Sequence, residues 1–175
     1  MSANQGLEIR WRATSDPSRE LARFFAGNIS PDYISHSELQ GNRALGVGRW
    51  RPDIVDIFDR EIENRVSSER GEIAKGAQSN PVLEARLDGR LVGIALVSMF
   101  PDAPVPYAVL EDIAVDETSR GQGIGDAVVA WVSDEARRHG CKRVFLESGL
   151  GNHKAHEFFE RRGFAPCSVV MMKEL

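Results

Sequence analysis

Cysteine is scarce in this chain of 175 residues, which holds only Cys141 and Cys167. The two are far apart and form no CxxC pair. A disulfide framework or a cysteine-ligated metal site needs more thiols at closer spacing. The sequence therefore predicts free thiols, a reducing compartment and no bound metal.

Long apolar runs are also missing. The longest, Leu91 to Phe100, has about half of the roughly 20 residues that a membrane helix needs. The segment from Met1 to Leu7 is polar and lacks the apolar stretch typical of a signal peptide. We therefore expect a cytoplasmic protein without a membrane partner.

Positive charge is not in excess, because 22 Lys and Arg residues face 26 Asp and Glu residues and the formal net charge is -4. Binding to nucleic acid depends on clustered Lys and Arg, so no nucleic-acid partner is predicted. A weakly acidic chain is compatible with a cationic amine as substrate. The length is typical of one domain, and an apolar content of 42% is typical of a globular one.

The hydrophobic pattern predicts strands and helices in alternation. Strands are expected over residues 7–11, 82–87, 91–99, 107–115, 142–147 and 169–174, and helices over 16–27, from 52 to 66, 123–138 and 152–162. Asp16 is expected to cap the first helix, and Asp88-Gly89 to form a hairpin turn. Residues 67–80 are polar and predict a surface loop. This order indicates an α/β fold with a mixed sheet and helices on both faces.

The strongest functional signal is the segment RGQGIG from Arg120 to Gly125, between a strand and an amphipathic helix. Glycines let the backbone approach a ligand closely, and the first amides of a helix attract anions. The segment predicts a phosphate or pyrophosphate site, with Arg120 as an added positive charge. A glycine-rich turn without a ligand is the alternative. The dinucleotide fingerprint is excluded by Asp126 in place of its third glycine, and the P-loop by the absence of a following Lys-Ser or Lys-Thr pair.

The second signal is the segment from Asn152 to Phe164, with the pattern N-x-x-A-x-x-F-F-x-x-x-G-F. Taken alone, it is compatible with an ordinary helix. Asn152 would cap it, Gly163 would end it, and Glu157 would pair with Arg161.

Together the two segments resemble the acetyl-CoA-binding half of the GNAT superfamily of N-acetyltransferases. The strand ending in Ile113-Ala114-Val115 and the hairpin over residues 82–96 are similar to further parts of that family's pattern. The resemblance covers residues 80–175 and leaves residues 1–80 as the variable, acceptor-side part of a single domain spanning 1–175. It implies a GNAT-like fold, with a mixed, mostly antiparallel central sheet, a splayed parallel strand pair and helices on both faces.

The resemblance also implies which residues bind acetyl-CoA. Backbone groups of the 113–115 strand would bind the pantetheine arm, amides of the glycine loop the pyrophosphate, and Asn152 the pantetheine or a nearby phosphate. The thioester would lie where the strands splay, beside Val115 and Glu147. The full set is Ile113, Ala114, Val115, Arg120, Gly121, Gln122, Gly123, Ile124, Gly125, Asn152 and Phe159.

The implied reaction is acetyl transfer from acetyl-CoA, without a metal, to a primary amine of a small molecule, peptide or protein by direct attack in a ternary complex. An amine near the reference pKa of lysine is mostly protonated at neutral pH, so a base must remove a proton. Glu111 is favoured as base or amine anchor, with Asp112, Glu147 and Ser148 as alternatives. Strand alternation places Glu111 and Asp112 on opposite faces, unless a bulge intervenes.

The chain departs from the family at Phe159, where the family's usual general acid is a tyrosine. His156, one turn earlier, is a candidate substitute, and water is another because a coenzyme A thiolate leaves readily. The missing hydroxyl keeps an alternative open: a catalytically degenerate acyl-CoA-binding or sensing module. The acceptor is not identified by any motif, and a homodimer is expected from the family alone.

Overall fold

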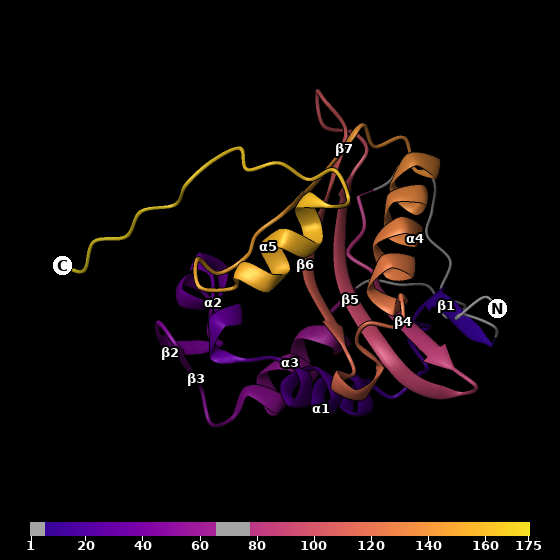
Figure 1. Cartoon of the computed structure of the whole chain (residues 1–175), viewed down its shortest axis with the longest axis horizontal. Coiled ribbons are helices and arrows are strands. Elements are labelled where there is room, and N and C mark those ends of the chain that lie inside the picture. The colour runs from indigo at the N-terminus through magenta and orange to yellow at the C-terminus, as the bar shows by residue number, and fades with distance from the viewer. Residues whose placement is uncertain (1–5, 66–77) are drawn as a thin grey trace. The chain divides into compact units, whose positions relative to one another are not determined.

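Residues 6–65 and 78–175 are described in this computed structural model (Figure 1). The chain divides into two compact units, one made of residues 1–29 and 53–147 and the other of residues 30–52 and 148–175. The end of the predicted second helix and most of the predicted loop over 67–80 lie outside the described residues.

The first unit is built on a five-stranded sheet with the order β1-β4-β5-β6-β7 (Figure 1). Its strands are β1 (Leu7–Trp11), β4 (Val82–Leu87), β5 (Arg90–Phe100), β6 (Tyr107–Val115) and β7 (Arg143–Leu146). The first four pair as antiparallel neighbours, and β6 and β7 pair in parallel. The predicted mixed, mostly antiparallel sheet is confirmed.

The predicted hairpin turn between β4 and β5 is confirmed as well. Asp88 has a φ of 50° and Gly89 a φ of 80°. Positive φ at both central residues matches the right-handed twist of the two flanking strands, which is why two-residue hairpins favour this turn.

Helices cover both faces of the sheet. On one face α1 (Ser18–Asn28) packs against α3 (Ile54–Glu63), where Phe25 and Phe58 stack with ring centroids 3.8 Å apart. On the other face α4 (Ile124–Arg138) lies so close to β5 that a Cβ added at Gly93 would meet side chains of Ile124 and Val128 at 3.6 Å. These two distances are ordinary van der Waals contacts, and the tighter neighbour of such a Cβ would be the Cβ of Ala85 on β4, at 3.2 Å.

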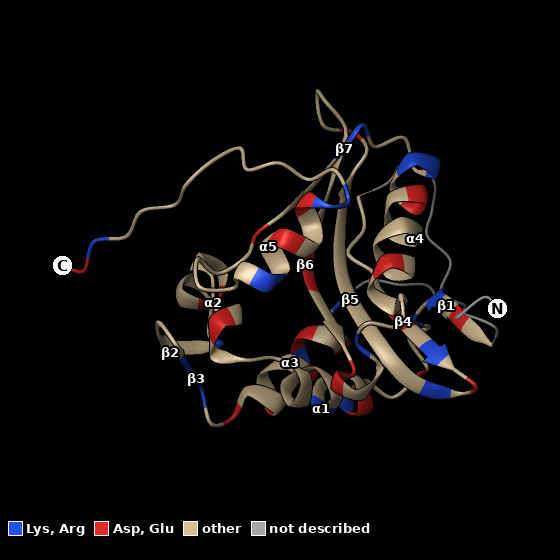
Figure 2. Cartoon of the chain, viewed as in Figure 1, with Lys and Arg blue, Asp and Glu red and all other residues tan. Residues whose placement is uncertain are grey.

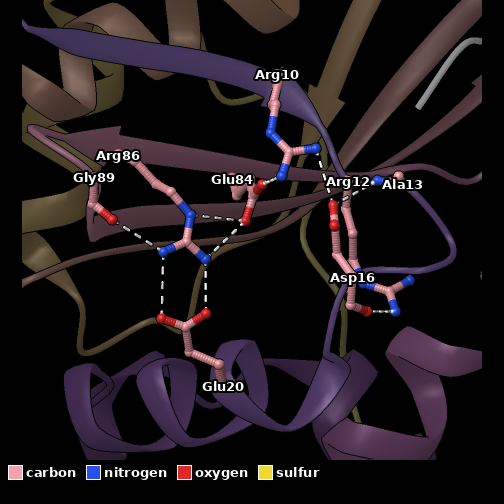
Figure 3. Close-up of polar contacts among 8 residues, drawn as sticks. All are labelled: Arg10, Arg12, Ala13, Asp16, Glu20, Glu84, Arg86 and Gly89. Carbon is pink, nitrogen blue, oxygen red and sulfur yellow. Dashed lines mark hydrogen bonds and ion pairs between the residues drawn. The ribbon is translucent and has the colours of Figure 1, made fainter. Parts of the chain in front are cut away.

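An ion-pair network joins β1 and β4 to α1 (Figure 3). Glu84 is 1% exposed and pairs with Arg10 and Arg86, and Arg86 also reaches Glu20 of α1 at 2.7 Å. A buried carboxylate without partners would be strongly unfavourable, so the two guanidinium groups compensate for its burial. One carboxylate in this protein thus accommodates two cations.

The start of α1 differs from the prediction, because Asp16 does not cap the helix. Its carboxylate accepts a hydrogen bond from the amide of Ala13 at 3.1 Å and pairs with Arg10 at 2.9 Å. Burial raises the pKa of Asp16, but these two partners outweigh it and the pKa lies below its usual value. The helix ends at Asn28, one residue past the predicted stop.

The second unit contains short elements, of which the sequence predicted only the last. They are η1 (Pro31–Tyr33), α2 (His36–Gln40), β2 (Ala44–Gly46), β3 (Arg49–Trp50) and α5 (His153–Glu160). A capping box starts α2, because the amide of Ser35 donates to Glu38 at 2.7 Å and the Ser35 hydroxyl accepts from the amide of Ser37. Elements this short show too few periods for a hydrophobic pattern to reveal them.

The predicted strand over residues 169–174 is wrong. Residues 164–175 form no strand, and the segment extends away from α5 to the C-terminus (Figure 1). Val170 is 53% exposed and Met171 91% exposed. A strand forms only where a neighbouring strand can pair with its backbone. The alternation of apolar side chains does not show whether such a neighbour is present, so the pattern over residues 169–174 was not sufficient to predict a strand.

Charges of both signs are interspersed over the helices (Figure 2). Along α4 the acidic residues begin in the first turn, whereas Arg137 and Arg138 lie in the last. This order is favourable for the helix dipole. None of the helices formed by the described residues is long and apolar enough to cross a membrane.

Candidate active site

The glycine-rich segment connects β6 to α4 by way of η2 (Glu117–Ser119), as the sequence predicts. Gly121 has a φ of 78° and Gly123 a φ of 81°, in the left-handed region that favours glycine. Gly123 directly precedes Ile124, the first residue of α4. The amides of Ile124 and Gly125 have no carbonyl one turn earlier within the helix to bond. These donors at the positive end of a helix suit a pyrophosphate.

Arg120 forms a brace between two other elements of the first unit. Its Nε donates to the carbonyl of Val115 at 3.2 Å, and its Nη2 donates to the carbonyl of Asn28 at 2.7 Å. The side-chain oxygen of Asn28 in turn accepts from the amide of Glu117 at 2.9 Å. The sequence predicts that the guanidinium of Arg120 attracts a bound anion. In the structure this group holds the end of α1 against the glycine-rich loop.

A second set of side chains stabilises the turn that precedes the glycine-rich loop. The carboxylate of Asp116 accepts from the hydroxyls of Thr118 at 2.6 Å and Ser119 at 2.7 Å, and from Arg90 at 3.1 Å. These hydrogen bonds, in that order of size, lower the pKa of Asp116 to about 2. This cluster was not predicted from the sequence, although Asp116 followed by Thr118 and Ser119 is a recognisable local turn signal.

The side chain of Gln122 is turned back toward η2. Its amide nitrogen donates to the carbonyl of Thr118 at 3.1 Å. The side chain of Gln122 therefore stabilises the turn that precedes the predicted anion loop.

The parallel strand pair separates where the resemblance places the pantetheine arm. Pairing of β6 with β7 ends at Leu110 and Leu146, whereas pairing of β6 with β5 continues to Val115 and Gly93. Ile113, Ala114 and Val115 lie on the part of β6 beyond this point. Among the described residues, β7 therefore does not pair with β6 beyond Leu110.

Glu111 lies at a bulge beside the same point. Leu96 pairs with Asp112 and Val97 with Leu110, so Glu111 is the extra residue on β6. The side chain of Glu111 is 32% exposed, whereas Asp112 is only 1% exposed. The two carboxylates therefore have different environments, and Glu111 is the more accessible.

Both oxygens of the Glu111 carboxylate have partners in the first unit. The hydroxyl of Ser98 donates to Oε1, and Nη2 of Arg65 donates to Oε2. Arg65 also donates through Nη1 to the carbonyl of Val97 at 3.4 Å, and its side chain is 12% exposed. Arg65 and Ser98 were not predicted from the sequence. A signal existed for Ser98, the one side chain with a polar group in the run from Leu91 to Met99.

The remaining predicted site residues lie on α5 in the second unit. Asn152 is at the N-cap position but makes no side-chain capping bond there. Phe159 is 7% exposed and packs edge-on against Phe158 and Phe164, with ring centroids 5.1 and 5.6 Å away. The ring of His156 lies 6.0 Å from that of His153.

The end of α5 follows the predicted helix signals. Gly163 has a φ of 85°, as expected just past a helix, and Glu157 pairs with Arg161 at 3.8 Å.

Among the described residues, His, Cys, Asp and Glu form no group of three that could hold a metal ion.

Comparison with known proteins gives consistent results. The model of the acetyltransferase (GNAT) family matches residues 49–164. The chain is 26% identical over 170 residues to a streptothricin acetyltransferase of Streptomyces lavendulae, which covers 97% of this chain and 88% of that protein. It is 33% identical over 136 residues to a glucosamine 6-phosphate N-acetyltransferase of Trypanosoma brucei brucei, covering 76% and 82% respectively.

The fold is also similar to known structures. One is an aminoglycoside N-acetyltransferase in complex with CoA, with a TM-score of 0.62 at 16% sequence identity, over 97% of this chain and 94% of that one.

Proposed function

Because the chain belongs to the GNAT family of acetyltransferases, we propose that it transfers the acetyl group of acetyl-CoA to a primary amine of a small molecule. The observation that carries this proposal is the glycine loop at the N-terminus of α4, beside the point where β6 leaves β7. An anion site beside the point where two parallel strands separate suits a ligand with a pyrophosphate and an extended arm.

The residues present fit acetyl-CoA, which supplies an activated acetyl group in the form of a thioester. The amides from Gly121 to Gly125 would hold the pyrophosphate, with the left-handed glycines keeping the backbone open. Backbone groups of Ile113 to Val115 would bind the pantetheine arm. The resemblance to the family assigns Asn152 a further contact with coenzyme A, and its side-chain amide is not used as a helix cap.

The proposed acceptor site is the carboxylate of Glu111. It is the exposed member of the pair on β6 and lies at the bulge where the strands separate. An ammonium group cannot attack a carbonyl, so a base must take a proton from the amine, and Glu111 is proposed for this role. A backbone amide of the 113–115 strand would stabilise negative charge on the carbonyl oxygen.

The leaving thiolate would be protonated without a dedicated side-chain acid. Phe159 has no hydroxyl, and its ring is packed between Phe158 and Phe164. Water would then supply the proton, since a thiolate is a good leaving group. His156 is the alternative acid.

A small molecule is the favoured acceptor class because the two relatives above are named for such acceptors. A panel should contain streptothricin, glucosamine 6-phosphate and a peptide with a free N-terminus. Thiol release from acetyl-CoA would be measured against each. Turnover of either small molecule would support the proposal, and turnover of the peptide alone would shift the acceptor class to proteins.

A second function is a catalytically degenerate module that binds or senses acyl-CoA, which the missing hydroxyl at Phe159 favours. Isothermal titration with coenzyme A separates the possibilities. Saturable binding without turnover of any panel amine would support the module. Absence of binding would contradict both functions.

A further inference from the structure

The proposed acceptor carboxylate already has a cationic partner of its own. Arg65, just beyond the end of α3, donates to Oε2 of Glu111 and is itself only 12% exposed. The bond from Arg65 to the carbonyl of Val97 fixes the guanidinium to the strand that carries Ser98. The ion pair of Arg65 and Glu111 is therefore held in place by other residues of the first unit.

The carboxylate of Glu111 can still accept a third donor. A carboxylate offers about four lone-pair sites, of which Ser98 and Arg65 use two. The Glu111 side chain is 32% exposed, which leaves an open side. Glu84 shows that one carboxylate in this chain can hold two cationic groups at once.

The charge of Arg65 matters for the protonation of a bound amine. A carboxylate alone favours the charged ammonium form, which cannot attack the thioester. A guanidinium beside it opposes that second positive charge. The pair then offers hydrogen-bond acceptors with little net charge, so an ammonium bound there gives up its first proton to water more readily, and Glu111 takes the second proton, which the nitrogen releases as it attacks the thioester.

We propose that Arg65 is a positioning residue that cancels the charge of Glu111, so that the acceptor binds as an amine ready to react instead of being held as ammonium. This inference rests on the proposed function, in which Glu111 receives the acceptor. Arg65 lies outside the acetyl-CoA motifs, and its ion pair with Glu111 would control the protonation of the acceptor amine.

The test is steady-state kinetics of Arg65→Gln with streptothricin, or with glucosamine 6-phosphate if that is the acceptor that turns over. Loss of the compensating charge should lower KM and kcat together, each by about 10-fold, and change kcat/KM much less. Arg65→Lys keeps the charge and should restore both constants to within about 2-fold of wild type. Loss of structure alone would raise KM or lower kcat without this paired decrease.

Two matched variants complete the design. Ser98→Ala removes a neutral partner of Glu111 and should not produce the paired decrease. In a Glu111→Gln background, Arg65→Gln should no longer lower KM, because there is no charge left to cancel. Thermal melting and coenzyme A affinity check the fold of every variant, and Arg65→Met, with a stem of similar length, replaces Arg65→Gln if that variant does not fold.

The outcomes separate the inference from the proposed function. If Glu111→Gln raises KM while Arg65→Gln changes neither constant, or raises KM, the role of Arg65 is refuted and Glu111 keeps its role. If Glu111→Gln leaves both constants unchanged in an active enzyme, Glu111 is not the acceptor site and the inference fails with it.

Discussion

Nη2 of Arg120 lies 2.7 Å from the backbone carbonyl of Asn28, and this bond ties the residue before the glycine loop to the end of α1. The same guanidinium holds the carbonyl of Val115 at the end of β6. Residues 92 positions apart in the chain thus shape one corner of the proposed coenzyme A site.

Replacing Arg120 should show that its geometry matters as well as its charge. Arg120→Ala should lower the melting temperature by about 2–4 °C, corresponding to about 1 kcal/mol, because the brace between α1 and β6 is lost. Arg120→Lys should not restore it, since an ammonium group cannot reproduce the fork that holds two carbonyls. The opposite result, normal melting of both variants with coenzyme A affinity lost only in Arg120→Ala, would assign Arg120 to phosphate charge alone.

Side-chain bulk in the anion loop should abolish coenzyme A binding. Gly125 is the best position for this test because it lies within α4, where other residues are tolerated. Gly121 and Gly123 have positive φ, so any substitution there would also strain the backbone. Gly125→Val should weaken binding by about 100-fold or more, measured by isothermal titration, with an unchanged circular dichroism spectrum. Gln122→Ala is the control and should change affinity by less than about 3-fold, as only a side-chain bond to Thr118 is lost. Unchanged affinity in Gly125→Val would mean that the loop is merely a turn.

Restoring the hydroxyl at Phe159 tests whether an acid is missing. Phe159→Tyr should preserve or raise turnover, because it adds an O–H where the family has one. His156→Ala should change turnover by less than about 3-fold, since a general acid typically contributes about 10²–10⁴ and none is assigned to this histidine. Thiol release would be followed for both variants from about pH 6 to about pH 10. A large loss of activity confined to His156→Ala would identify that histidine as the acid.

The stability contributed by Asp116 should disappear in acid. Its pKa is lowered to about 2 by Thr118, Ser119 and Arg90, so the ionised form stabilises the fold above the unfolded value of 3.8 and this stabilisation is lost as the pH falls toward about 2. Asp116→Asn should reduce the free energy of unfolding at pH 7 by about 1 kcal/mol or less, because its ion-pair partner Arg90 is 57% exposed and the pair is screened by solvent. Urea unfolding of both proteins should show a constant difference down to about pH 4 that narrows below it. A difference independent of pH would rule out the ionised carboxylate as its source.

The sequence by itself determined the features that depend on neighbouring residues. The five strands of the sheet, the turn at Asp88-Gly89 and the left-handed glycine at 163 follow from alternation, turn chemistry and helix-ending signals. The glycine loop and the segment from Asn152, taken together, indicate the family from the sequence alone. Each of these signals lies within a short stretch of chain, where local physics decides the conformation.

Only the tertiary structure decided the partners of the candidate catalytic groups. Arg65 and Glu111 are 46 residues apart, and no periodicity relates them. The bulge that exposes Glu111 arises from the pairing of β6 with β5, and the predicted strand over 169–174 is absent because its side chains specified no partner. Hydrogen bonds and ion pairs between distant segments depend on how the chain is folded back on itself, and that information is not contained in any single stretch of residues.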